Sequence, residues 1–494
     1  MDLIDERFAP PDKARLLREL VTIMPVHAVL STVEQLAPYE CDGLAVYRNL
    51  PLAVVLPETE AQVAAVLKAC RSLNVPIVAR GAGTGLSGGA MPHDQGIVLS
   101  LAKLNRILAV DPLARTARVQ PGVRNLAISE AAAPYGLYFA PDPSSQIACT
   151  IGGNVAENSG GVHCLKYGLT VHNLMAVRAY TIDGELLEIG GDSLDAPGYD
   201  LLALVTGSEG LLAVTTEVTV RLLPTPKTAR AILAAFDRIE AAGQAVADVI
   251  AAGIIPAGME IMDRATIHAA EQYVHAGYPL DAEAILIVES DGTATEVDDE
   301  IEKINAVLER AGASQLRVSR TEQERYKFWS GRKAAFPAIG RITPDYYCID
   351  GTVPRKRLAE VLRGIREMET KYGLRCANVF HAGDGNLHPL IMFDASKPGE
   401  IERTEAFAAE ILELSVQVGG TITGEHGVGV EKINQMCAQF EAPELAMFRG
   451  VKGAFDEAGL LNPGKAIPTL RRCAEYGRMH VHDGRLPHAE LPRF

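Results

Sequence analysis

Three histidines and one glutamate in the second half of the chain have the types and spacing of a catalytic metal site. His381 and His388 stand on either side of a short glycine-rich stretch, and a two-residue turn at 384–385 would place them opposite each other on neighbouring strands. Directly opposed residues have Cβ atoms about 4.5–5.5 Å apart, so both imidazoles could reach one ion. Glu425 and His426 follow in a second glycine-rich stretch. Two histidines and one carboxylate are typical of a divalent metal that keeps a position open for water or substrate.

These residues alone leave the reaction open. The same ligand types suit Fe(II). A metal held in this way can also activate water, which makes a metal-dependent hydrolase one candidate. Each histidine taken singly could be an ordinary packed or exposed imidazole. We favour a joint site because all of these residues are flanked by glycines.

Glycine-rich segments in the first half of the chain predict a large cofactor. Residues 83–88 match the GxGxxG pattern, but a strand expected at 97–101 leaves no room for the helix that a Rossmann site needs. We therefore expect a strand, a glycine loop (81–89) and a second strand, with backbone N–H groups open to a phosphate. A merely flexible loop is the alternative. A second segment (141–161) and a third segment (207–211) combine glycines with amides and hydroxyls, which suits a polar, flat ring system.

Alternating strands and helices must position both groups of residues. In the first half we expect strands at 52–56, 76–79 and 211–223 and a helix at 59–73 that Thr59 can cap. A Pro-Thr-Pro sequence at 224–226 predicts a domain boundary. Beyond it we expect strands at 231–236, 258–262 and 285–289, and helices to about 252 and at 294–312, 329–339 and 355–372. The predicted domains are a helical lead-in at 1–47, a first domain at 48–226, a second at 227–469 and a polar tail at 470–494.

Composition excludes several classes of protein. The chain has 494 residues and a formal net charge of −15, which argues against a nucleic-acid-binding surface. With 48% apolar and 22% charged residues, it has the composition of a globular protein. We find neither a signal peptide nor an apolar run of about 18 residues that could span a membrane. The cysteines form no CxxC pair, which argues against an iron–sulfur centre in this chain. We therefore expect a cytoplasmic protein.

The three glycine-rich segments together resemble the FAD-binding domain of the vanillyl-alcohol oxidase / p-cresol methylhydroxylase superfamily, over about residues 48–226. The resemblance implies an α+β fold, with a two-part FAD-binding domain followed by a C-terminal α+β substrate or cap domain of the FAD-linked oxidase type. It implies that the FAD pyrophosphate lies on Gly81, Gly83, Thr84, Gly85, Leu86, Ser87, Gly88 and Gly89, beside Arg80. It implies that the flavin and ribityl chain lie along Pro141, Asp142, Ser145, Thr150, Gly152, Gly153, Asn154, Asn158 and Gly160. The remaining cofactor-binding residues that it implies are Glu209, Gly210, Val214 and Asn462. Because the glycine loop contains neither histidine nor cysteine, we expect non-covalent FAD, with His93 just beyond the loop.

The second half resembles the C-terminal domain of the FAD-linked D-2-hydroxyacid dehydrogenases, over about residues 227–468. The resemblance implies that His381, His388 and Glu425 bind a divalent metal, Zn²⁺ or Mn²⁺. It implies that His426 is the catalytic base and that Arg332 binds the substrate carboxylate, for which a planar guanidinium is suited.

The segment 344–352 is similar to the FAD-binding subunits of bacterial glycolate oxidases, a group within this family. Relatives that act on dicarboxylates carry a lysine where this chain has Cys348, which favours a small monocarboxylate such as glycolate or D-lactate. The resemblance implies hydride transfer from a small D-2-hydroxy acid to FAD, with glycolate oxidised to glyoxylate. It also implies a second flavoprotein-like subunit and an iron–sulfur subunit, which could hold the protein peripherally at the inner membrane.

Three alternatives follow from the same residues. The first is a stand-alone D-lactate dehydrogenase that passes electrons to a cytochrome or quinone. The second is the metal-dependent hydrolase, which leaves the glycine-rich segments unexplained. The third is a catalytically silent subunit that binds flavin for assembly only, and the complete set of metal and base residues argues against it.

Overall fold

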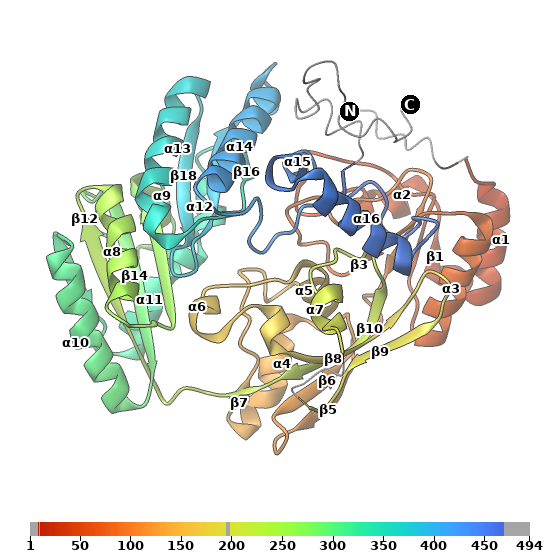
Figure 1. Ribbon diagram of the computed structural model, residues 1–494, viewed down its shortest axis with the longest axis horizontal. Coiled ribbons are helices and arrows are strands. Elements are labelled where there is room, and N and C mark those ends of the chain that lie inside the picture. Colours follow the sequence, from red (N-terminus) through yellow and green to blue (C-terminus); the bar gives the residue numbers. More distant parts are fainter. Residues whose placement is uncertain (1–7, 9, 194–197, 469–494) are drawn as a thin grey trace. The chain divides into compact units, whose positions relative to one another are not determined.

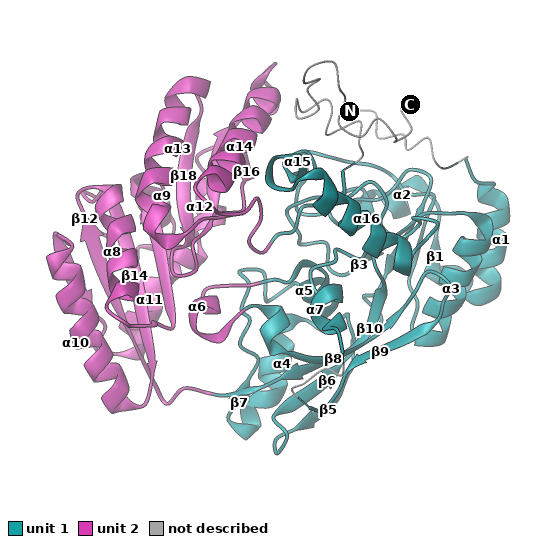
Figure 2. Ribbon diagram, in the orientation of Figure 1, with its two compact units in different colours: residues 1–159, 169–224, 426–494 teal, residues 160–168, 225–425 magenta. Residues whose placement is uncertain are grey.

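The computed structural model describes residue 8, residues 10–193 and residues 198–468. The chain divides into two compact units (Figure 2). Unit 1 comprises residues 1–159, 169–224 and 426–494, and unit 2 comprises residues 160–168 and 225–425.

This division differs from the predicted chain order in two places. The last part of the chain belongs to unit 1, because Leu461 pairs in parallel with Ile77 and the Asn462 N–H donates to the carbonyl of Ile77 at 2.7 Å. A short segment of the first half, 160–168, belongs to unit 2. Such long-range pairings carry no local sequence signal. The predicted tail at 470–494 lies outside the described residues.

Unit 1 contains two main sheets. The first has the order β1–β2–β4–β3, with strands β1 (Val29–Leu30), β2 (Ala53–Val55), β4 (Ile97–Ser100) and β3 (Ile77–Arg80). Helices α1 (Lys13–Ile23) and α3 (Glu60–Leu73) contribute buried side chains to the hydrophobic core that includes these strands. The second sheet has the order β5–β6–β10–β8–β9, with strands β5 (Ile107–Asp111), β6 (Thr116–Val119), β10 (Val214–Arg221), β8 (Leu174–Tyr180) and β9 (Leu186–Gly190).

Local sequence signals account for the start of unit 1. The helix predicted at 59–73 is α3, and Thr59 caps it by accepting a hydrogen bond from the Gln62 N–H at 3.2 Å. Residues 81–96 are all described and contain no helix, which confirms the predicted strand, loop and strand. β3 and β4 pair in parallel across this connection.

The second glycine-rich segment contains a helix that the sequence analysis did not predict. Its centre forms the short helix α5 (Ile151–Glu157). The helix ends at Asn158, whose φ of +54° turns the backbone into the left-handed conformation that asparagine tolerates. Gly152 allows this helix to pack closely against Pro121, because a Cβ on Gly152 would lie only 2.6 Å from Pro121 Cβ.

Unit 2 is built on one extended antiparallel sheet. Its order is β15–β12–β14–β13–β18–β19–β17, and β20 pairs with both β16 and β18. The strands are β12 (Thr228–Phe236), β13 (Gly258–Asp263), β14 (Ala284–Gly292), β15 (Gln315–Val318), β16 (Asp345–Cys348), β17 (Gly351–Thr352), β18 (Arg375–His381), β19 (Asn386–Leu387) and β20 (Pro389–Phe393). The three strands predicted first after the domain boundary correspond to β12, β13 and β14.

Helices pack against this sheet (Figure 1). α8 (Ile239–Ala251) and α10 (Ala294–Arg310) contact β12 and β14, while α9 (Arg264–Val274) and α13 (Leu358–Tyr372) contact β18. The helix predicted at 329–339 begins earlier, as α11 (Glu322–Lys333), and a break at Ala334 separates it from α12 (Ala335–Ile339). None of the helices in the described part of the chain combines the length and apolarity needed to cross a membrane.

Candidate active site

The three glycine-rich segments predicted to bind a cofactor lie together in unit 1. A Cβ on Gly81 of the glycine loop would lie only 2.2 Å from Thr150 Oγ1 of the second segment. The second segment in turn adjoins the third, because the Glu209 N–H donates to the Ala156 carbonyl at 2.8 Å. Segments more than 50 residues apart therefore form one continuous surface, as a large ligand requires.

The C-terminal part of unit 1 forms hydrogen bonds with the same glycine-rich segments. Asn462, predicted to bind the cofactor, donates its Nδ2 hydrogens to the carbonyls of Gly89 at 3.0 Å and Glu209 at 2.6 Å. The Val430 N–H donates to the Ser87 carbonyl at 3.0 Å. Asn462 thus joins the glycine loop to the third segment.

This surface has the features of a site for a polar ligand. The hydroxyl oxygens of Ser87 and Thr150 are buried and have no hydrogen-bond partner among the described residues. Gly83 and Gly88 have φ values of +70° and +77°, which favour glycine. A Cβ on Gly85 would meet only one atom within 4 Å, the Asp42 carboxylate at 3.8 Å. Buried donors beside open backbone fit the FAD that the sequence predicts.

Three of the predicted cofactor residues also have contacts that the sequence did not indicate. The Arg80 guanidinium donates from Nη1 to the carbonyls of Cys41 at 2.8 Å and Ala90 at 3.3 Å, so it links the residue that follows the glycine loop to Cys41. Val214 belongs to the hydrophobic core of the first sheet. Gly160 belongs to unit 2, where its N–H donates to Glu425 Oε2 at 2.9 Å. The cofactor role predicted for each residue of this set, these three included, stays a prediction.

In unit 2 the structure brings together the three predicted metal ligands. His381 Nε2 lies 3.2 Å and His388 Nε2 lies 3.1 Å from the same oxygen, Glu425 Oε1. One ligand atom from each residue lies within 4.8 Å of the other two. The two imidazole planes are nearly perpendicular, with ring centroids 5.1 Å apart. This donor set fits a divalent cation.

The predicted turn between the two histidines has a different register. His381 pairs with Asn386 instead of His388, so four residues connect the strands where we expected two. The Gly385 N–H donates to the His381 carbonyl at 3.1 Å, with a φ of +85° at Gly385. The close approach of Val353 requires glycine at position 385 of this turn, because a Cβ on Gly385 would lie 2.1 Å from the Val353 carbonyl oxygen. His388 still approaches His381 because it lies between β19 and β20, both of which pair with β18.

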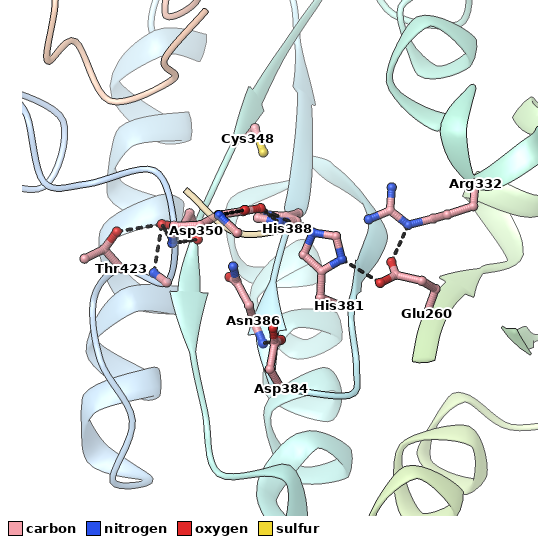
Figure 3. A network of polar contacts seen from close by, with 12 residues as sticks. Glu260, Arg332, Cys348, Asp350, His381, Asp384, Asn386, His388 and Thr423 are labelled. Carbon is pink, nitrogen blue, oxygen red and sulfur yellow. Dashed lines mark hydrogen bonds and ion pairs between the residues drawn. The ribbon is translucent and has the colours of Figure 1, made fainter. Parts of the chain in front are cut away.

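Glu260 on β13 contacts two of the predicted site residues, His381 and Arg332 (Figure 3). We did not single it out from the sequence. Its Oε1 lies 2.5 Å from His381 Nδ1, and its Oε2 accepts a hydrogen bond from Arg332 Nε at 2.5 Å. All three side chains are at most 3% exposed. The signal available was a single acidic residue within the apolar strand at 258–262, since a buried carboxylate requires partners.

Arg332, predicted to bind the substrate carboxylate, is therefore only partly available. Its Nε is committed to Glu260, whereas its buried Nη2 has no hydrogen-bond partner among the described residues. A guanidinium presents five N–H donors in a planar fork, so the remaining edge can still receive a carboxylate.

The carboxylate of Asp350, which the sequence analysis also did not single out, accepts hydrogen bonds from the loop that carries Glu425. Asp350 is fully buried, and its Oδ2 accepts hydrogen bonds from Thr423 Oγ1 at 2.6 Å and from the Gly424 N–H at 2.9 Å (Figure 3). The Glu425 N–H donates to Asp350 Oδ1 at 3.2 Å. Backbone and side chain of Glu425 are thus both fixed, the latter by the N–H of Gly160.

The charges of this cluster favour a bound cation. Burial alone would raise the pKa of Glu425, but hydrogen bonds from His381 and His388 hold it well below its usual value. Burial alone would lower the pKa of His381, but the carboxylates of Glu260 and Glu425 raise it well above the usual value. With His381 neutral, the two carboxylates and the guanidinium of Arg332 leave one net negative charge, which would attract a divalent cation.

His426, the predicted base, directly follows Glu425 in the chain. It is the first residue of the C-terminal part of unit 1, whereas the three predicted metal ligands belong to unit 2. Its role as the base stays a prediction.

Comparisons with known proteins agree with this architecture. Residues 225–466 match the family described as "FAD linked oxidases, C-terminal domain", and residues 51–190 match "FAD binding domain". The chain is 60% identical over 491 residues to the glycolate oxidase subunit GlcD of Escherichia coli K12, covering 99% of this chain and 98% of the relative. The D-lactate dehydrogenase of Anaerostipes hadrus is 32% identical and covers 86% of this chain, which spans 91% of that relative.

This chain belongs to the FAD-linked oxidase family.

The fold of this FAD-linked oxidase also has solved counterparts. The structure of p-cresol methylhydroxylase with substrate bound aligns with a TM-score of 0.78 at 16% sequence identity, covering 95% of this chain and 98% of that one. The fold is therefore of the p-cresol methylhydroxylase type that the sequence predicts. FAD binding and flavin-dependent oxidoreductase activity follow from the family.

Lys465 is a buried cation in unit 1 of this FAD-linked oxidase. Its Nζ donates to the Met91 carbonyl and to Asn462 Oδ1, and burial lowers the pKa of Lys465 to about 7. An unfolded lysine has a pKa near ~10.4. Between these values the unfolded chain holds one proton more than the folded chain, so the free energy of unfolding rises with pH.

We therefore expect a pH dependence that Lys465→Met removes. From pH 7 to pH 9, the free energy of unfolding of the wild type should rise relative to the variant by up to about 2.7 kcal/mol, at about 1.36 kcal/mol per pH unit for one proton. Urea unfolding of both proteins across this range measures the difference. An identical pH dependence in the two would show that Lys465 does not change its charge on unfolding.

Proposed function

We propose that this FAD-linked oxidase converts glycolate to glyoxylate by hydride transfer from the substrate to FAD. The observation that carries the proposal is the convergence of His381, His388 and Glu425, with Arg332 joined to the same cluster through Glu260. A cation site and a guanidinium together suit an α-hydroxy carboxylate, which offers a hydroxyl and a carboxylate on adjacent carbons. The name of the 60% identical relative, a glycolate oxidase subunit, supports this substrate.

We further propose that His381, His388 and Glu425 hold Zn²⁺ or Mn²⁺. A divalent metal bound there would polarise the substrate hydroxyl and lower its pKa. Two imidazole nitrogens directed at one carboxylate oxygen support this assignment, as does the carboxylate of Glu260 behind His381.

The cofactor residues belong to unit 1. FAD, when bound, accepts the hydride that leaves C2 of the substrate. The buried hydroxyls of Ser87 and Thr150 would donate to its polar groups, and the glycine loop would admit the pyrophosphate. We propose that FAD is held without a covalent bond. In support, the loop contains no histidine or cysteine, and His93 Nδ1 accepts a hydrogen bond from the Gln95 N–H at 3.1 Å.

Two further residues complete the proposed mechanism. His426 would accept the hydroxyl proton as the general base. Arg332 would bind the substrate carboxylate through its Nη atoms, because its Nε already donates to Glu260. The positive charge of Arg332 orients the substrate and favours the carboxylate over a neutral alcohol.

D-Lactate is the second candidate substrate. The Anaerostipes hadrus relative is named a D-lactate dehydrogenase, and D-lactate differs from glycolate by one methyl group. Cys348 stands where relatives that act on dicarboxylates carry a lysine, so a small monocarboxylate is favoured in either case. A methyl group in an apolar pocket changes affinity by only about 10–200-fold, so direct comparison must decide.

We propose that the electrons leave through partner subunits. The Escherichia coli relative is named a subunit, which supports an assembly. A second flavoprotein-like subunit and an iron–sulfur subunit would provide the path, because this chain has no CxxC cysteine pattern for a cluster. Such partners would place the protein in the cytoplasm, peripherally at the inner membrane, with a quinone as one possible acceptor.

Anaerobic reduction tests the substrate assignment. We expect the visible flavin band of the purified protein to bleach on addition of glycolate without oxygen, with D-lactate added to a parallel sample. Bleaching by D-lactate but not by glycolate would make D-lactate the substrate in place of glycolate. A flavin band unchanged by both acids would contradict the proposed substrate class, and absence of a flavin band after reconstitution with FAD would favour a metal-dependent hydrolase.

A further inference from the structure

Glu260 contacts two parts of the site at once. Its side chain is fully buried on β13, and its two oxygens go to different partners, His381 Nδ1 and Arg332 Nε, each at 2.5 Å (Figure 3). These partners come from β18 and α11. One carboxylate therefore joins a proposed metal ligand to the residue proposed to bind substrate.

The contact with His381 determines which ring nitrogen faces the metal site. An ionised carboxylate only accepts hydrogen bonds, so His381 Nδ1 must carry a hydrogen when it contacts Glu260. His381 Nε2 lies 3.2 Å from Glu425 Oε1, and a cation bound there would take the place of the hydrogen between them and meet the Nε2 lone pair. Glu260 thus orients the ring and selects the tautomer that can bind a cation.

The contact with Arg332 fixes the direction of the guanidinium. With Nε bound to Glu260, the Nη atoms are left for another acceptor, and Nη2 is buried without a partner among the described residues. Removing Glu260 would leave Arg332 as a buried charge without this carboxylate, and its side chain would then lose the restraint on its orientation.

A second buried carboxylate holds the same helix at another point. Glu289 on β14 accepts hydrogen bonds from Arg325 Nη1, at 3.0 Å to each oxygen, and from Trp329 Nε1 at 2.5 Å. Arg325, Trp329 and Arg332 are spaced four and three residues apart on α11, so they share one helix face.

The register of the sheet explains why two carboxylates can hold one helix face. Glu289 is opposite Gly258, two residues from Glu260 on β13, so both carboxylates lie on the same side of the sheet. Glu260 contacts the proposed metal ligand as well as α11. Glu289 contacts α11 through Arg325 and Trp329, and its Oε1 also lies 3.5 Å from His163 Nε2, but it contacts no proposed metal ligand. The two residues therefore allow the two effects to be separated.

We propose that Glu260 is a positioning residue that sets both His381 for cation binding and Arg332 for substrate binding, and that Glu289 positions Arg332 through α11 without contacting a proposed metal ligand. This inference rests on the proposed function and extends it to residues that contact neither substrate nor metal directly.

The test compares Glu260→Asp, Glu260→Gln and Glu289→Gln in the FAD-loaded enzyme after removal of metal by a chelator. We expect the dissociation constant for Zn²⁺, measured by equilibrium dialysis, to rise about 10–100-fold in both Glu260 variants, as for other residues that support metal ligands. Glu260→Asp keeps the negative charge that compensates Arg332, so we expect this variant to fold. Its shorter side chain cannot reach both His381 and Arg332. Glu289→Gln should leave Zn²⁺ affinity unchanged but raise KM for glycolate about tenfold.

The outcomes separate this inference from the proposed function. Zn²⁺ affinity at the wild-type level in Glu260→Asp would overturn the role of Glu260. An equal loss of Zn²⁺ affinity in Glu289→Gln would show a general loosening of the unit instead. If the wild type itself neither binds Zn²⁺ nor reacts with glycolate or D-lactate, the proposed function fails. The crystal structure of Glu260→Asp then decides the inference: displaced His381 and Arg332 side chains support it, and unchanged ones overturn it.

Discussion

Replacing His426 by alanine should lower kcat for glycolate by about 10²–10⁴-fold, the usual contribution of a general acid or base. The proton of the α-hydroxyl must leave as the hydride is transferred, and without the imidazole only water can accept it. Bound FAD should be retained, because the Ser87 and Thr150 hydroxyls and the glycine loop are unchanged in this variant. Steady-state kinetics, together with the flavin absorbance per protein, measures both effects.

His27→Ala provides the matched control, because His27 is an exposed histidine of the same unit. This variant should have wild-type kcat and flavin content. Near-normal turnover in His426→Ala would remove His426 from the role of base. Loss of FAD together with turnover would instead indicate that His426 supports the cofactor surface.

Replacing Glu425 by glutamine should abolish metal binding and lower kcat/KM by about 10³-fold. The substitution keeps the shape of the side chain but removes the charge on the oxygen that lies 3.1–3.2 Å from both imidazoles. A metal that acts as a Lewis acid contributes several kcal/mol, and about 4 kcal/mol corresponds to three powers of ten. Metal analysis by mass spectrometry and kinetics with glycolate measure the two losses.

Glu302→Gln is the corresponding control, since Glu302 is an exposed glutamate of α10 in the same unit. It removes the same charge from unit 2 without touching the site, and we expect wild-type metal content and kinetics. If Glu425→Gln retained full activity without metal, the cluster would be a structural charge network and the metal assignment would be wrong. Restoration of activity in the chelator-treated wild type by Zn²⁺ or Mn²⁺ would identify the ion.

Local features of the sequence were sufficient to predict that His381, His388 and Glu425 lie together and to predict much of the secondary structure. Gly88, Gly89 and Pro92 follow the motif at once and a strand begins by about 97, so no helix fits and the glycine loop could be separated from a Rossmann site. Thr59 marked the start of α3, because a side chain that caps a helix acts within three residues. Likewise, glycines beside His381, His388 and Glu425 indicated a site because ligand types and nearby backbone freedom are visible along the chain.

Only the tertiary structure decided which distant residues meet. The four-residue turn after His381 depends on Val353, about 30 residues away, whose carbonyl excludes any side chain at Gly385. The return of residues 426–468 to unit 1 depends on pairing with Ile77. Glu260 was visible as an acidic residue in an apolar strand, but its partners come from a different strand and a helix. Such contacts depend on register and long-range packing, whose energies are spread over many residues and leave no periodic pattern in the sequence.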